Sequence, residues 1–81
     1  MNPERLQLKG LLAQSRKSLR ALDTEASGQV FIIRTILNPY EEILNIDTEK
    51  ALVCLNRLND IKNEMSALSE KIKKMECEFE Q

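Results

Sequence analysis

The sequence predicts an all-α protein, an antiparallel helical hairpin of two long coiled-coil helices joined by a short connecting helix. Apolar residues recur at heptad spacing along both halves of the chain, as they do in helices that pack along a common seam. Only two Gly and two Pro occur in 81 residues, so few turns divide the chain. We therefore expect one domain over residues 1–81, with long helices over about 3–37 and 48–80 and a connection over about 38–47.

The first long helix is predicted to begin at Pro3 and to end at Leu37. Asn2 can cap the first free amides, and proline suits the first helical position because an N–H there would have no partner. Ser15 and Gln29 interrupt the apolar seam of this helix. The apolar seam positions are Leu8, Leu12, Leu19, Leu22, Ala26, Ile33 and Ile36.

Residues 28–33 allow a competing interpretation as a β-strand, because they follow a glycine and are rich in β-branched side chains. No second run of this kind is present to pair with them, and a lone strand is not stable. We favour a helix that tolerates Gly28 at a cost of about 1 kcal/mol or that kinks there.

The connection carries the signals that end one helix and start another. Asn38 precedes Pro39, which cannot continue the helical hydrogen bonding and fits the first position of a new helix. With Glu41 completing a capping box, we expect a short helix over residues 39–45. Asp47 then supplies the cap of the second long helix.

The second long helix has the clearest seam in the sequence. All nine of its seam positions are apolar: Ala51, Cys54, Leu58, Ile61, Met65, Leu68, Ile72, Met75 and Phe79. Such a helix needs a partner for its stripe, and the matched lengths of the two helices favour an antiparallel hairpin. The distribution of charge also favours the antiparallel arrangement, because it places residues 1–20 beside residues 64–81. The first segment holds five basic residues against Glu4 alone, and the second holds five glutamates. Each exposed ion pair contributes only about 0–1 kcal/mol.

Composition excludes several function classes. The net charge of −1 argues against strong attraction to nucleic acid or to an anionic membrane, and no apolar run approaches the ~20 residues of a membrane span. Residues 1–10 carry charges where a signal peptide needs an apolar core, so we expect a cytoplasmic protein with no membrane partner.

The reactive side chains predict no catalysis, no cofactor and no metal. Cys54 and Cys77 would lie roughly 35 Å apart on one helix, too far for a disulfide, and we expect Cys54 to be buried and Cys77 exposed. Without histidine or a Cys-x-x-Cys spacing, zinc has no site. Glu41 and Glu42 are better explained as a solvated helix start than as paired catalytic acids. We therefore expect that the protein is not an enzyme.

Tyr40, the only tyrosine, has two interpretations. We favour packing over the helix ends, where it would close the hairpin. The alternative is a recognition anchor at the tip of the connection.

The order of elements resembles that of a family. The chain resembles small uncharacterised helical proteins of Mu-like transposable phages and related prophages. The resemblance lies in the order of a long amphipathic helix, residues 36–40, Ile46-Asp47 and a second heptad helix. The distinctive part covers only the connecting residues. The resemblance implies a bacterial or phage origin and no catalytic residues, and it supplies no function.

Surplus apolar surface near the connection predicts self-association, because a two-helix hairpin covers only one narrow stripe on each helix. The expected surface contains Val30, Phe31, Ile32, Ile33, Ile36, Leu37, Leu52, Val53, Leu55 and Leu58. We expect a coiled-coil interaction or scaffold protein whose partner is a second copy, a dimer first and a tetramer second, assembled as a four-helix bundle.

Two alternatives remain open. One is a small nucleic-acid-associated protein that uses a basic N-terminal face, made of Lys9, Arg16, Lys17 and Arg20. The other is a chaperone or adaptor that holds a helix of another protein in its groove.

Overall fold

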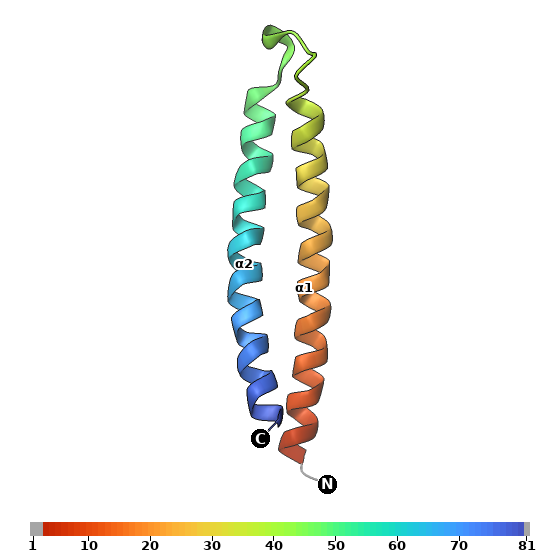
Figure 1. Cartoon of the computed structure of the whole chain (residues 1–81), viewed down its shortest axis with the longest axis vertical. Coiled ribbons are helices and arrows are strands. Elements are labelled where there is room, and N and C mark those ends of the chain that lie inside the picture. Colours follow the sequence, from red (N-terminus) through yellow and green to blue (C-terminus); the bar gives the residue numbers. More distant parts are fainter. Residues whose placement is uncertain (1–2, 81) are drawn as a thin grey trace.

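Two long antiparallel helices make up the molecule (Figure 1). The computed structural model describes residues 3–80. Helix α1 spans Pro3–Ile36 and helix α2 spans Thr48–Glu80. They lie side by side in a rod that measures 64 × 15 × 14 Å, and the N-terminal end of α1 and the C-terminal end of α2 lie at the same end of this rod. No strand occurs between residues 3 and 80, and the predicted helical hairpin is confirmed.

The seam between α1 and α2 uses the predicted heptad positions. All nine seam positions of α2 are buried or half-buried, and Ile61 is completely buried. On α1 the two polar seam residues are accommodated as well, with Ser15 buried and Gln29 half-buried. The cluster nearest the chain ends contains Leu8, Leu12, Leu19, Leu68, Ile72 and Met75.

The strand interpretation of residues 28–33 is wrong, because α1 continues through them without interruption. Figure 1 shows no sharp bend along α1. A Cβ added at Gly28 would meet no atom within 4 Å, so the glycine is not required by packing. The helix tolerates Gly28 within its length, and the packing of the seam outweighs the weak helix propensity of one residue.

The connection differs from the prediction, because residues 39–45 do not form a helix of one or two turns. Only a single turn of 3-10 helix, η1, spans Ile43–Asn45, and the residues on both sides of it, Glu42 and Ile46, are extended. An isolated helical turn orders several residues for few hydrogen bonds, and this turn has no buried residue to stabilise it.

Asn38 stabilises a tight turn instead of capping a helix. Its Oδ1 accepts a hydrogen bond from the backbone N–H of Tyr40 at 3.0 Å, and its carbonyl accepts one from Glu41 N–H at 3.1 Å. The carboxylate of Glu41 accepts from the N–H of Glu42 at 3.3 Å. It is therefore occupied locally, and the predicted capping box does not form.

The predicted start of the second long helix is confirmed. The Oδ1 of Asp47 accepts a hydrogen bond from Lys50 N–H at 3.0 Å, and the Asp47 carbonyl accepts one from Ala51 N–H at 3.1 Å. The side-chain bond satisfies an amide that lacks a partner inside the helix, and the carbonyl bond is the first bond of the helical ladder. The corresponding cap predicted for α1, Asn2, lies outside the described residues.

Candidate functional site

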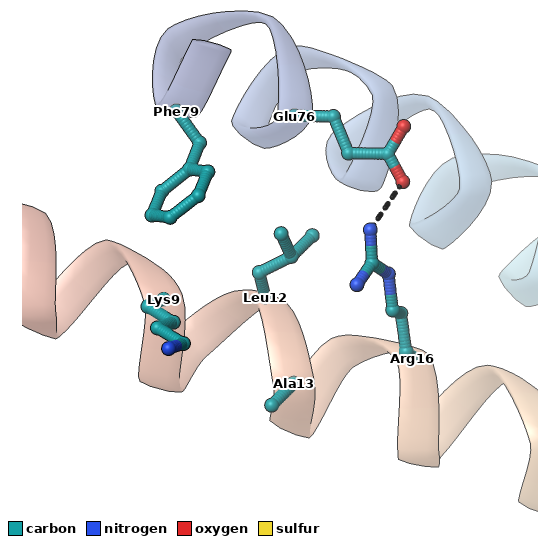
Figure 2. Close-up of a pocket in the computed structure, with 6 residues that line it drawn as sticks. All are labelled: Lys9, Leu12, Ala13, Arg16, Glu76 and Phe79. Carbon is teal, nitrogen blue, oxygen red and sulfur yellow. Dashed lines mark hydrogen bonds and ion pairs between the residues drawn. The ribbon is translucent and has the colours of Figure 1, made fainter.

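Two ion pairs across the seam set the register of the hairpin. Arg16 Nη2 donates to Glu76 Oε1 at 2.9 Å near the chain ends, as Figure 2 shows. Nearer the middle, Arg57 donates from Nε and Nη2 to the two carboxylate oxygens of Glu25, at 2.5 and 2.9 Å. The predicted meeting of the basic N-terminal segment with the acidic C-terminal helix is thus confirmed in the pair of Arg16 and Glu76.

The two ion pairs lie on opposite sides of the seam, and residues at heptad spacing from each pair share its side. The Arg16 side holds Arg16, Asp23 and Val30 of α1, Leu37 directly after its end, and Leu55, Lys62, Ser69 and Glu76 of α2. The Arg57 side holds Ser18, Glu25 and Ile32 of α1 with Lys50, Arg57 and Glu64 of α2.

The Arg57 side is closed by charged groups. The two parallel hydrogen bonds from Arg57 to Glu25 form the fork geometry that guanidinium and carboxylate groups favour. The hydrogen bond from Arg57 holds the pKa of the Glu25 carboxyl below its ordinary value of 4.5, against a smaller opposing effect of desolvation. The same hydrogen bond raises the pKa of Arg57. This side offers a polar surface to its surroundings.

The Arg16 side is open in the middle of the hairpin. A groove of about 510 Å³ lies there, which we call the mid-hairpin groove. It is lined by Leu19, Ala26, Leu58, Lys62, Met65, Ser66 and Ser69. Four of these residues are apolar side chains of the seam, so the groove gives access to the edge of the core. Lys62 supplies the one charged group in the lining.

The end of the hairpin near the connection exposes many large apolar side chains. Of the ten residues predicted for self-association, six are exposed in the hairpin: Val30, Phe31, Leu37, Leu52, Val53 and Leu55. The other four, Ile32, Ile33, Ile36 and Leu58, are half-buried. Three heptads toward the connection from Arg16 and Glu76, Leu37, directly after α1, and Leu55 of α2 both fall on the Arg16 side. Apolar surface therefore continues from the mid-hairpin groove to the connection.

Three further exposed apolar side chains lie in the connection itself, and sequence periodicity did not identify them. Tyr40 is 95% exposed, Ile43 79% and Leu44 98%. The expectation that Tyr40 packs over the helix ends is wrong, because the turn at Asn38 directs the chain away from the ends of the seam. The available signal was composition: three apolar residues beside Glu41 in a segment with no buried side of its own.

The basic N-terminal cluster is only partly engaged. Arg16 is paired with Glu76, while Lys17 and Arg20 are exposed and make no ion pair within residues 3–80. A hollow of about 320 Å³ lies beside the Arg16–Glu76 pair. Among its lining residues, Leu12 is directed between the helices (Figure 2). The hollow is lined by Lys9, Leu12, Ala13, Arg16, Glu76 and Phe79.

The N-terminal end of α1 is fixed to α2 by one arginine. The guanidinium of Arg5 lies over the ring of Phe79, 4.9 Å from its centre, and Nη2 donates to the Phe79 carbonyl at 2.9 Å. A cation over an aromatic face contributes about 0.5–1 kcal/mol at an exposed site. Arg5 therefore links the N-terminal end of α1 to the C-terminal end of α2.

The two cysteines are distributed as predicted. Cys54 is buried in the seam and Cys77 is exposed, and both are free thiols. Within the described residues, no group of three or more His, Cys, Asp or Glu side chains is arranged to hold a metal ion. Neither α1 nor α2, over the residues described, contains a stretch long and apolar enough to cross a membrane.

No family model, no curated protein and no solved structure matches the chain.

Proposed function

We propose that the protein is a non-enzymatic, self-associating scaffold, in which two hairpins pair through the end near the connection to form a four-helix bundle. The observation that carries the proposal is the concentration of exposed apolar side chains at this end. Among the residues that the structure describes, eleven large apolar side chains are exposed, and nine of them lie between residues 30 and 55. Full burial of one such side chain is worth about 1.5–3 kcal/mol, so covering several of them favours association.

The total surface supports the same proposal. The hairpin exposes 6705 Å², whereas a compact monomer of 9.3 kDa exposes about 5000 Å² by the scaling of folded proteins. A stable interface of standard size buries about 800 Å² on each partner. The excess surface of a single hairpin is therefore large enough to supply one such interface.

A structural role is also consistent with the state of the side chains that catalysis would use. The carboxylate of Glu41 accepts local bonds from Glu42 N–H and Asn45 Nδ2, and the thiol of Cys54 is buried in the seam. The free thiols suit a reducing compartment, and we propose the cytoplasm as the location.

Light scattering coupled to size exclusion tests the proposal. The wild-type chain should have twice the chain mass of 9.3 kDa. Leu55→Glu should reduce the mass to that of one chain, because it places a charge in the interface. Leu55 is 52% exposed in the single hairpin, so the substitution leaves the fold intact, which circular dichroism checks.

The matched control is Glu70→Ala, because Glu70 is exposed and lies outside the apolar end. This variant should keep the wild-type mass. A wild-type chain that is well folded and monomeric at micromolar concentration would contradict the proposal. The apolar end would then be a docking site for a different protein, as in the chaperone or adaptor alternative.

A second candidate, nucleic-acid binding, is favoured by the exposed and unpaired state of Lys17 and Arg20. Binding through phosphates depends steeply on salt concentration. An electrophoretic mobility assay at low and moderate salt would show a shift that weakens with salt and that is lost in Lys17→Ala/Arg20→Ala. No shift at low salt excludes this candidate.

A further inference from the structure

We infer that the mid-hairpin groove receives the connection of a second copy, so that two hairpins overlap only by their halves near the connection. In this arrangement the chain ends of the two copies point in opposite directions. The inference rests on the self-association proposed above and adds the occupant of the groove and the orientation of the pair.

The groove calls for an apolar segment with negative charge. Its floor consists of apolar seam residues, and Lys62 lies in its lining. Arg20 follows directly on Leu19, which also lines the groove, and Asp23 is the one acidic residue of this stretch of the Arg16 side. The surroundings of the groove therefore carry a net positive charge.

The connection has the complementary chemistry. Tyr40, Ile43 and Leu44 present apolar side chains that are 79–98% exposed, and Glu41 and Glu42 present carboxylates beside them. Apolar residues would cover the floor of the groove, while the glutamates approach Lys62 and Arg20. Such complementarity fixes the register of a contact more than it adds affinity.

The spacing of groove and connection fits a two-fold pair. The groove is centred on α1 between Leu19 and Ala26, which is about 20 Å from the end of α1 at ~1.5 Å per residue. A two-fold axis perpendicular to the helices, midway along this distance, passes close to Val30. Each connection then lies on the groove of the other copy, and the same axis brings the exposed Val30 and Leu55 of both copies together.

Charge distinguishes this overlap from a side-by-side pair with all chain ends together. Among the side chains described on or next to the Arg16 side, the half near the chain ends carries Lys9, Arg16, Arg20 and Lys73 against Glu76. Side-by-side pairing would press two such basic surfaces against each other. The overlapped pair separates them by far more than the Debye length of about 8–10 Å, so their repulsion is screened.

Crosslinking between copies tests the inference. Both copies carry Cys77→Ser, and the buried Cys54 is kept. One copy carries Leu44→Cys, and the other carries Ser66→Cys in the groove and a size tag that separates the mixed product. A short bismaleimide should join positions 44 and 66 at least about tenfold faster than in a mixture of unassociated chains, because pairing raises the effective concentration.

The matched control replaces Ser66→Cys by Asn63→Cys. Asn63 lies within one helical turn of Ser66 on α2 but on the outer face of the helix. Its crosslinking to position 44 should stay at the rate of unassociated chains. A dimeric mass with equal crosslinking at 63 and 66, or with none at 66, overturns the inference and leaves the proposed function standing. A monomeric mass without crosslinks refutes both.

Discussion

Ile61→Ala should be among the most destabilising substitutions in the chain, because Ile61 is the one described side chain with no exposed surface. The change removes three buried carbon groups at about 0.8 kcal/mol each, or about 2.4 kcal/mol. The register of Leu12 with Met75, followed for two heptads, places Ala26 opposite Ile61. So small a neighbour cannot fill the space, and a cavity cost brings the total to about 3–4 kcal/mol.

The assay is urea unfolding followed by circular dichroism at a fixed protein concentration, because association contributes to the apparent stability. Leu11→Ala is the matched control. Leu11 is 54% exposed, and we expect a loss below about 1 kcal/mol there. A loss for Ile61→Ala that is as small as the control would refute the placement of Ile61 in the seam.

Three further predictions concern single features of the helices. Gly28→Ala should raise the free energy of unfolding by about 0.5–1 kcal/mol in urea titrations, because a Cβ there meets no atom within 4 Å. A lower free energy of unfolding in this variant would mean that the helix is strained at Gly28. The lowered pKa of Glu25 stabilises the fold above the ordinary carboxyl pKa of 4.5, and this is lost as the pH falls through the lowered value. In thermal melts, the wild type should therefore have a higher melting temperature than Glu25→Gln near neutral pH and the same melting temperature in strong acid. The same difference in melting temperature at both pH values would exclude the pairing with Arg57. Native Cys77 should react with a bulky maleimide much faster than Cys54, and equal rates would contradict the register of α2.

Heptad periodicity was sufficient to predict the two helices and the seam. Each seam residue of α2 is buried or half-buried because one narrow stripe of a long helix has only one partner to pack on. Even the polar interruptions Ser15 and Gln29 lie in the seam, since the residues one turn away on either side fix their position. Local propensity at Gly28 was a weaker signal than the period of the whole helix.

The connection could not be predicted in the same way. The signals at Asn38 and Pro39 are those of a helix start, but a start needs a following apolar stripe that can pack. Residues 39–45 extend beyond the end of the seam, so no packing stabilises a helix, and Asn38 uses its side chain to close a turn. The exposure of Tyr40 follows from the same cause.

The sequence was sufficient to predict which residues form the apolar surface, but not how the Arg16 side and the Arg57 side of the seam differ. Composition identified the apolar end, whereas the difference between the Arg16 side and the Arg57 side depends on which charges pair across the seam. Glu25 and Arg57 are separated by 32 positions, and only the register of the folded hairpin brings them together. That register also leaves the mid-hairpin groove uncovered on the Arg16 side.

Small-angle X-ray scattering tests the central claim most directly, because it reports the mass and the longest dimension of the particle together. A single hairpin measures 64 Å, with a Cα radius of gyration of 18.4 Å. For the wild-type chain we predict the mass of two chains and a longest dimension of about 80–85 Å, from two rods whose chain ends each lie about 40 Å from an axis near Val30 at ~1.5 Å per residue. A two-chain mass with a length near 64 Å would contradict the overlap, and a one-chain mass at every concentration would contradict self-association itself.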